Sequence, residues 1–482
     1  MSSGESGGRE MTEEMETSRS PAGRKAKSSR DLTTGPIGGH LLQMAAFIAL
    51  GLIVQTLQFL VDLYFVGHLG EAAVAGVSSA GTATFVAMAA TQLVAIGSLS
   101  LISQAVGRKD DADAQRVFEG ALSLSLVIGA ATLLLGYTAG MAGVRALAAD
   151  APTAAAGQAY LAAFLPSLAL MFPVTAMASA LRASGVVGGP MLIQLLTVLL
   201  NAILAPLLIT GWGTGYPLGV AGAGLASSIA TLLGAIAVAA LFERMQGHLR
   251  LSAPLMLGRL DIWRRITAVG LPAAGEFLML FVISGSMYWI IRGFGAHAQA
   301  GFGIASRVMQ SIFLPAMAVA FAAAPIAGQN FGAGLSDRVR ATFRHSAVAG
   351  SAIMLALTLL CQIKPEALLQ PFSTDADVIA VGAQYLRITS WNFVAIGLVF
   401  ACSGMFQAFG DTRPSLFSSS ARMLTFVLPA LWLARQPGVE LRHLWYLSVA
   451  SVSIQALTSL ALLHRQMRMK LQPATPPVSL AV

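Results

Sequence analysis

A carboxylate stands inside a long apolar stretch near the start of the chain. Residues 41–67 are apolar for long enough to cross a bilayer, which takes about 20 residues in a helix, yet they contain Asp62. On a helical period Gln55, Gln58 and Asp62 share one face. A charge in hydrocarbon costs roughly 2.5–3.5 kcal/mol on insertion scales, so such groups normally face a cavity or another helix. We expect the stripe to face a bundle interior, where Asp62 can load and release a cation. The alternative is a wetted carboxylate at the outer helix end.

A second polar stripe lies in the apolar segment 190–211. Gln194, Thr197 and Asn201 repeat the spacing of the first stripe and share one helical face. Two interpretations of Asn201 stay open. It either takes part in a cation site with Asp62 or makes a hydrogen bond between helices, which is typically worth about 0.6–2 kcal/mol in a membrane.

A third group of charges lies in the second half of the chain. Glu276 lies well inside the apolar segment 266–291, and Arg307 and Arg387 lie inside two later apolar segments. Leaving a carboxylate and a guanidinium unpaired in one bundle is costly. We therefore expect Glu276 to pair with Arg307 or Arg387, either as a structural bridge or as a switch that a proton or a cationic compound opens.

The composition indicates that membrane-spanning helices hold these groups. The chain has 482 residues, of which 56% are hydrophobic and 11% charged, whereas soluble proteins carry about 25% charged residues. The sequence predicts an all-α polytopic membrane protein with twelve transmembrane helices. The expected helices cover residues 41–66, 72–103, 117–144, 153–181, 190–211, 218–242, 266–291, 297–329, 339–362, 376–408, 415–434 and 443–463.

Basic residues predict the orientation. With the N-terminus inside, 22 of the 30 Lys and Arg residues fall on the cytoplasmic side, five fall in outer loops and three lie within helices. This split follows the positive-inside rule and predicts that both termini are cytoplasmic. The net charge of +8 therefore needs no nucleic-acid partner. The first 35 residues lack an apolar core and are not a secretory signal peptide.

An internal repeat divides the chain. An offset of 225 residues pairs Gln104 with Gln329 and Gly107 with Gly332 without a gap, and it pairs Gly185 with Gly410 further on. Because six helices lie in each copy, the sequence predicts two parallel six-helix lobes related by an axis along the membrane normal. The expected divisions are a disordered tail at 1–35, an N-lobe at 36–243, a cytoplasmic linker at 244–265, a C-lobe at 266–466 and a C-terminal tail at 467–482.

The order of several short motifs resembles a known family. The pieces are VDLYFVGHLGEAAVAG, SQAVGRKD, LRASG followed by a proline, NAILAP, GVAGAGLAS, GLPAAGE, AGQNFGA and FQAFGDTRP, spread over residues 38–466. Together they resemble the multidrug and toxic compound extrusion (MATE) transporters. The resemblance implies the MATE fold and a secondary antiporter, which needs no cofactor beyond the transported H⁺ or Na⁺.

The resemblance also implies roles for single residues. In MATE proteins an acidic residue at the place of Asp62 is implicated in binding the coupling cation. Asn201 and Ser227 match further members of that network, but Ala205 stands where many members carry an aspartate. Losing one carboxylate favours proton over sodium coupling. Glu276 matches an acidic position that some sodium-coupled members use in the seventh helix.

Flexible and aromatic side chains are candidates to line a substrate path. Methionine and aromatic rings suit varied hydrophobic cations, although ordinary packing is the better explanation for any one of them. The candidates are Met279, Met287, Tyr288, Met309, Gln310 and Phe321, with Trp289 and Met317 beside them.

Other chemistry finds little support. Asp110, Asp111 and Asp113 resemble the diphosphate-binding clusters of prenyl-transfer enzymes, but no second cluster follows and helix capping explains them. No nucleotide-binding or hydrolase motif appears. Cys361 and Cys402 lie in apolar segments, where they are expected to pack rather than to bind a metal or form a disulfide. The sequence thus predicts no catalytic residue and no metal site.

We therefore expect a multidrug antiporter of the bacterial inner membrane. It would export small hydrophobic or cationic compounds as a monomer embedded in the lipid bilayer, in exchange for H⁺ or Na⁺, with H⁺ favoured. Two alternatives stay open. One is a flippase for a lipid-linked precursor, which a strongly cationic cleft would favour. The other is an intramembrane polyprenyl-diphosphate transferase acting through Asp110 and Asp111. A major facilitator fold is disfavoured because its basic loop motif is absent.

Overall fold

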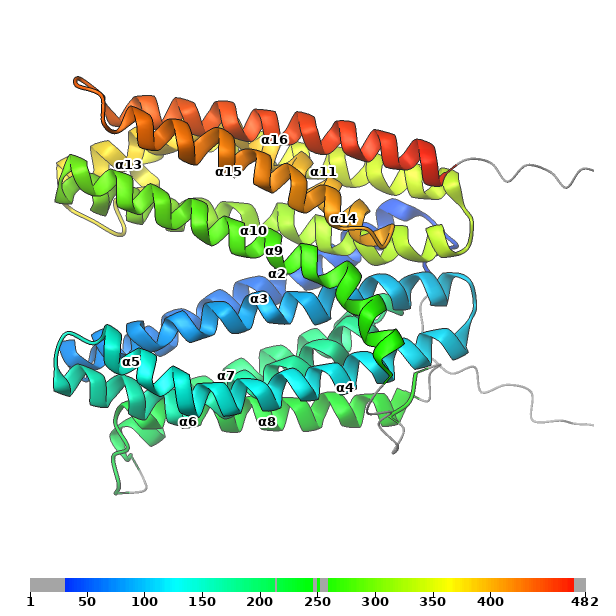
Figure 1. The fold of residues 1–482 in the computed structure, drawn as a ribbon, viewed down its shortest axis with the longest axis horizontal. Helices are drawn as coiled ribbons and strands as arrows, with labels where there is room; N and C mark the ends of the chain where they lie inside the picture. Colours follow the sequence, from blue (N-terminus) through cyan, green and yellow to red (C-terminus); the bar gives the residue numbers. More distant parts are fainter. Residues whose placement is uncertain (1–30, 213–214, 246–248, 252–258, 472–482) are drawn as a thin grey trace, which may run out of the picture.

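The fold is a bundle of long membrane-spanning helices (Figure 1). The computed structural model describes residues 31–212, 215–245, 249–251 and 259–471, and only the backbone of 59, 60, 62, 63, 82, 83 and 245. Over this part of the chain, twelve helical spans are long and apolar enough to cross a membrane, which confirms the expected number. Most of the expected tails at 1–35 and 467–482, and part of the linker at 244–265, lie outside the described residues.

The spans of the described chain divide evenly between the two copies of the repeat, six in each. The first half contains α2 (Ile37–Gly67), α3 (Glu71–Gly107), α4 (Asp111–Leu135), α5 (Met141–Leu147), α6 (Ala151–Ala183), α7 (Gly188–Thr210) and α8 (Val220–Met245). The second half contains α9 (Leu260–Ile291), α10 (Ala296–Gly332), α11 (Ser336–Ile363), α12 (Pro365–Leu369), α13 (Ala376–Thr389), α14 (Phe393–Ala408), α15 (Arg413–Leu433) and α16 (Leu441–Lys470).

Two spans are interrupted. A π-helical turn, Gly136–Gly140, joins α4 to α5, and a 3-10 turn, Ser390–Asn392, joins α13 to α14. Each pair of helices still forms one continuous crossing. The seventh span begins at Leu260, six residues before the expected start at 266. Its first turns contain Asp261, Arg264 and Arg265, which lower the hydropathy there and hid them from the sequence pattern.

Both described ends of the chain lie at the same end of the bundle (Figure 1). We call this end the base; it also holds the turns 108–110 and 333–335. Leu32 is fully buried there, and its amide donates to Gln329 Oε1 at 3.1 Å. Arg338 of the second half donates from Nη1 to the Gly35 carbonyl at 3.0 Å. The first described residues of the chain are thus hydrogen-bonded to the second half.

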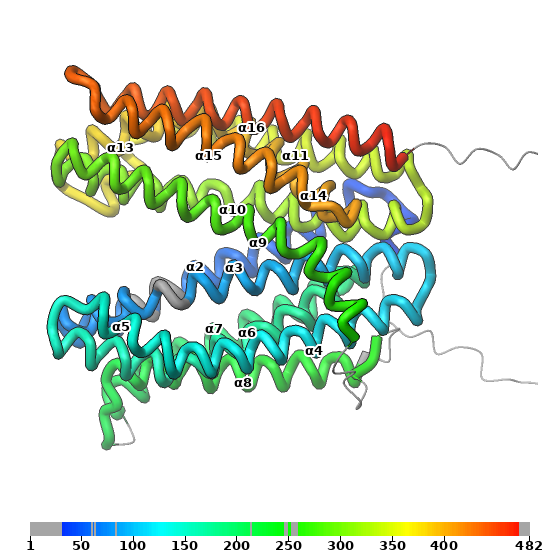
Figure 2. The backbone as a smooth tube through the Cα atoms, in the orientation of Figure 1, coloured from blue at the N-terminus to red at the C-terminus, as the bar shows by residue number. Residues whose placement is uncertain are grey.

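The first helix of each half packs against a helix of the other half. α2 packs against α10, and α9 packs against α3 as well as against α15 of its own half. α9 begins beside α4 at the base and then crosses to the second half (Figure 2). There, Trp263 Nε1 donates to Ser123 Oγ at 3.0 Å. This exchange matches the internal repeat and holds the halves together at the base.

Candidate functional site

A cavity of about 430 Å³ lies mainly in the first half. Its walls come from α2, α3, α6, α7 and α8, and α9, α10 and α14 of the second half close one side. The walls are largely apolar with a few amide and hydroxyl groups, which is the usual character of a site for a small molecule. Its size also falls within the range of roughly 300–1,000 Å³ for such sites.

The two polar stripes meet at this cavity. Gln55 and Gln58 from α2 line it, as do Gln194 and Thr197 from α7. These four residues face one another because α2 packs directly against α7. The helical register continues the α2 stripe to Asp62, one turn beyond Gln58, but the side chain of Asp62 lies outside the described residues.

Asn201 and Ser227 lie further from the base than Gln194 and Thr197, with Asn201 one turn beyond Thr197 on α7. Asn201 is fully buried on α7, and Ser227 of α8 donates to its Oδ1 at 3.3 Å. Ala205, one turn along α7, is also fully buried. The alanine side chain carries no oxygen, so this position lacks the carboxylate that a two-acid cation site would need.

Glu276 lies outside the cavity, half-buried on α9. Ser403 of α14 donates to its Oε1 at 3.1 Å, and Ser403 lies 2.9 Å from the Ser415 hydroxyl of α15. Glu276 is therefore held by a hydroxyl relay within the second half.

The expected ion pairs of Glu276 are wrong. Arg387 instead pairs with Glu366, Nη2 to Oε1 at 2.9 Å, at an exposed position. Arg307 is exposed, and it makes no ion pair with Glu276 among the described residues. Both arginines are exposed rather than buried beside Glu276, which sequence spacing could not reveal.

The predicted lining residues are mostly elsewhere. Of the six, Phe321 lines the cavity, and Met317 beside it does too. Met287 belongs to the packed core of the second half, and Gln310 is exposed. Met279, Tyr288 and Met309 do not line the cavity in this conformation. The candidates were chosen for the methionine and aromatic side chains of α9 and α10, whereas this cavity lies mainly in the first half. A role for the other candidates in lining a substrate path stays a prediction.

Arg182 is a charged cavity residue that the sequence analysis missed. It lies on the last turn of α6, where the hydropathy pattern had assigned it to a loop, and it lines the cavity. Its Nη2 donates to Ser179 Oγ at 3.0 Å, while Nε is buried and has no hydrogen-bond partner among the described residues. The repeat offset pairs Arg182 with Gln407, which also lines the cavity; that pairing was the signal available in the sequence.

The acidic loop at the base has a structural role. The Asp110 side chain caps α4 by accepting from the Asp113 amide at 2.9 Å. Asp113 in turn pairs with Arg108 at 3.0 Å and with Arg265 of α9 at 2.9 Å. These contacts use the carboxylates to join the halves, as the capping interpretation expected for Asp110.

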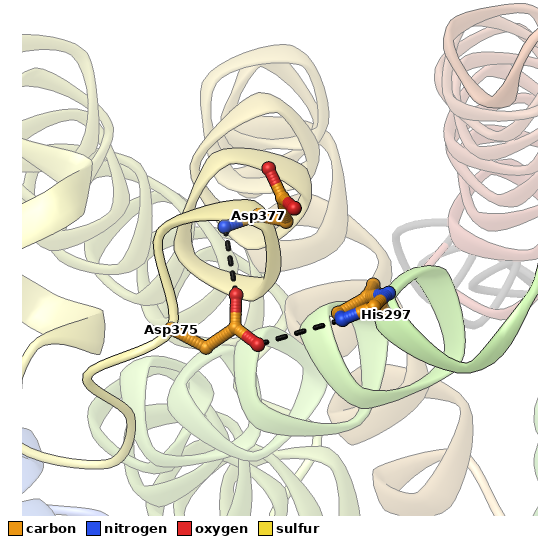
Figure 3. Close-up of side chains that lie close together, drawn as sticks. All are labelled: His297, Asp375 and Asp377. Carbon is orange, nitrogen blue, oxygen red and sulfur yellow. Dashed lines mark hydrogen bonds and ion pairs between the residues drawn. The ribbon is translucent and has the colours of Figure 1, made fainter.

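One group of side chains with metal-binding chemistry lies far from the cavity. His297, Asp375 and Asp377 bring one ligand atom each within 4.8 Å of one another (Figure 3). They lie at or beside the starts of α10 and α13, at the end opposite the base (Figure 1). All three are exposed, and Asp375 Oδ1 already accepts from the amides of Asp377 and Val378 as the cap of α13. Capping explains this arrangement.

The comparisons with known proteins decide the family. The MatE family model matches residues 48–207 and 272–432, which is most of both halves. The chain belongs to the MATE family. Its fold and membership make it a membrane transporter rather than an enzyme.

Individual relatives agree with this assignment. The chain is 27% identical to the probable multidrug resistance protein YpnP of Bacillus subtilis, over 86% of this chain and 90% of that protein. It is 23% identical to the multidrug export protein MepA of Staphylococcus saprophyticus, over 88% of this chain and 93% of that protein. A multidrug resistance MATE family transporter of the MOP superfamily, solved in an outward-facing conformation, superposes with a TM-score of 0.85 at 20% identity. The superposition covers 93% of this chain and all of that one, so the fold is shared.

Proposed function

We propose that this MATE protein exports small hydrophobic compounds across a bacterial inner membrane in exchange for protons. The observation that carries the proposal is the cavity of the first half, with the polar stripes of α2 and α7 on its walls. The names of the relatives YpnP and MepA support multidrug export. The base then faces the cytoplasm, as its basic residues require under the positive-inside rule. The protein works as a monomer.

Coupling is assigned to Asp62. Its place on α2 lies one turn beyond Gln58 and on the same face, next to the wall that leads to Asn201 and Ser227. Loading a proton neutralises a carboxylate that is costly inside a membrane and so favours one arrangement of the halves over the other. Glu276, with its serine partners, is a second candidate proton site in the other half.

The proton is preferred to sodium on ligand grounds. A bound metal cation needs several oxygen ligands at once, whereas a single carboxylate can carry a proton. The buried Ala205 supplies no oxygen where a second acid would stand. The described lining of the cavity holds one arginine rather than the strongly cationic wall that would favour a lipid-precursor flippase.

Transport into proteoliposomes tests the assignment. Purified wild type, Asp62→Asn and Glu276→Gln are reconstituted, and proton and sodium gradients are imposed separately. Ethidium and dansylaminoundecanoic acid serve as cationic and anionic fluorescent probes, and the exposed Asp337→Asn serves as a control. We expect the proton gradient to drive transport of at least one probe in the wild type and the control but not in Asp62→Asn. Transport by Asp62→Asn at the wild-type rate would remove this residue from coupling, and transport driven only by sodium would overturn the proton.

A further inference from the structure

A guanidinium group lines the cavity, and it makes no ion pair among the described residues. Arg182 is the one charged side chain among the described residues that line the cavity. Within the part of the chain that the structure describes, it makes one polar contact, the bond to Ser179 on its own helix, and its buried Nε has no partner. A charge taken out of water without an opposite charge is unfavourable, so a structural role alone would select against it.

The pseudo-symmetry of the fold provides an internal control. Arg182 and Gln407 occupy equivalent positions, and both line the cavity. Each immediately precedes a carbonyl that a glutamine of the other half binds: Ala183 O accepts from Gln329 at 2.6 Å, and Ala408 O accepts from Gln104 at 2.8 Å. The same contact therefore forms with a neutral amide in one half and a guanidinium in the other. Closing the base does not require the positive charge.

The surroundings of Arg182 define what it can bind. The cavity walls beyond it are apolar, with Met88, Met171, Phe277 and Phe321 among them, and neutral amides stand at Gln58 and Gln194. An anionic group would complete the hydrogen bonding of the guanidinium through its planar donor set. A hydrocarbon or aromatic body would fill the apolar remainder of the cavity.

We propose that the cavity selects amphipathic anions, carboxylates or phosphate monoesters with an apolar body, and that Arg182 binds the anionic group. This inference rests on the proposed function, because it takes the cavity to be the substrate site. It reverses the charge preference expected from the sequence. The anion has two possible sources, a soluble amphiphile or the headgroup of an anionic lipid, and both share the same chemistry.

The test compares two probes of one shape. Dansylaminoundecanoic acid and its methyl ester differ by one negative charge, and dansyl emission rises in an apolar site. Dissociation constants are measured for both probes with the full-length protein in neutral detergent, without any ion gradient, and protein-free micelles provide the background. The variants are Arg182→Gln, which copies the residue of the second half, and Arg182→Lys, which keeps the charge. Arg435→Gln removes an exposed positive charge away from the cavity and is the matched control.

We expect the wild type and the Arg435→Gln control to bind the acid about tenfold or more tightly than the ester. Arg182→Gln should bind the two probes equally and keep the wild-type affinity for the ester, while Arg182→Lys should keep part of the preference. Equal binding of acid and ester by the wild type would overturn the proposal, and so would a preference that survives in Arg182→Gln. If Arg182→Gln fails to fold, the wild-type comparison and Arg182→Lys decide alone.

Competition distinguishes the two sources. Displacement of the bound probe by dodecanoate or dodecyl phosphate, but not by dioleoyl phosphatidylglycerol in mixed micelles, identifies a soluble amphiphile. The opposite pattern identifies a lipid headgroup, and displacement by neither competitor would overturn the site. Because binding is measured without a gradient, a charge preference in a protein that fails to transport would overturn the proposed antiport but not the anion site.

Discussion

Gln104 and Gln329 make the same hydrogen bond in opposite directions across the base. Gln104 Nε2 of the first half donates to Ala408 O of the second at 2.8 Å, and Gln329 Nε2 of the second donates to Ala183 O of the first at 2.6 Å. We call this pair of bonds the glutamine latch. Both glutamines lie 225 residues apart in equivalent positions, so the latch follows the symmetry of the repeat. It joins the halves at the end where they are closest (Figure 1).

Removing the latch should open the base. A neutral hydrogen bond contributes about 0.5–1.5 kcal/mol, so replacing both glutamines by alanine should cost the closed base about 1–3 kcal/mol. Alternating access depends on such an equilibrium between two arrangements of the halves. Arg244 and Asp337 are both exposed at the base, so each can be replaced by a spin-labelled cysteine. Double electron–electron resonance between the two labels should show a longer-distance population in Gln104→Ala/Gln329→Ala. Labelling is selective because Cys361 and Cys402 are fully buried.

A matched control separates the latch from the loss of any glutamine. Gln299 lies at the opposite end of the second half, and Gln299→Ala should leave the distance distribution unchanged. A double variant with the wild-type distribution would show that the latch does not hold the base closed.

Two glycines make the latch possible. A Cβ on Gly107 would lie 2.0 Å from the Gln329 carbonyl oxygen, and one on Gly332 would lie 2.1 Å from the Gln104 carbonyl oxygen. Both obstacles are backbone atoms, which cannot rotate away. We therefore expect Gly107→Ala and Gly332→Ala each to destabilise the closed base by about 1–3 kcal/mol, the usual cost of overpacking.

The same label pair and thermal unfolding in detergent measure this effect. Gly143→Ala is the control, because a Cβ added at Gly143 would meet no atom within 4 Å and a helix interior favours alanine. It should be neutral or slightly stabilising. If the base of Gly107→Ala closes as it does in the wild type, α3 and α10 can move apart at this contact without a loss of stability.

Asp113 should be the most important carboxylate for stability at the base. Its side chain is only 9% exposed and pairs with Arg108 and with Arg265 of the other half. Removing one partner of a buried pair leaves the remaining charges poorly solvated. Asp113→Asn should therefore lower the free energy of unfolding by about 1–3 kcal/mol, as measured by denaturation in detergent.

The exposed pair of Asp337 and Arg340 provides the comparison. The Asp337 side chain is 98% exposed, so Asp337→Asn should change the stability by less than about 0.5 kcal/mol. Equal effects of the two substitutions would show that the contact of Asp113 with α9 carries no special weight.

Asn201 and Ser227 should be only weakly coupled in stability. Their hydrogen bond is long, at 3.3 Å, so a double-mutant cycle with Asn201→Ala and Ser227→Ala should give an interaction energy of about 0.5 kcal/mol. The single change Asn201→Ala should still cost more than Ser227→Ala, because the buried Asn201 fills more space. A coupling energy well above about 1 kcal/mol would indicate a stronger bond than the distance implies.

The sequence by itself determined the number of spanning helices and the division into two parallel halves. Each spanning helix needs its own long apolar segment because lipid offers no hydrogen bonds to the backbone, so hydropathy reveals it locally. The offset that pairs Gln104 with Gln329 also predicted the repeat, since equivalent close contacts at the base need equivalent residues. The two stripes that meet at the cavity, around Gln58 and Thr197, follow from helical periodicity alone.

Only the tertiary structure decided which groups meet. Glu276 faces Ser403 rather than Arg307 or Arg387, and the cavity lies mainly in the first half rather than along the methionines of the second. Arg182 reads as a loop residue in the sequence, yet the last turn of α6 places it on the cavity wall. Such partners lie far apart along the chain, and their contact depends on the rotation and approach of packed helices, which no local pattern of residues contains.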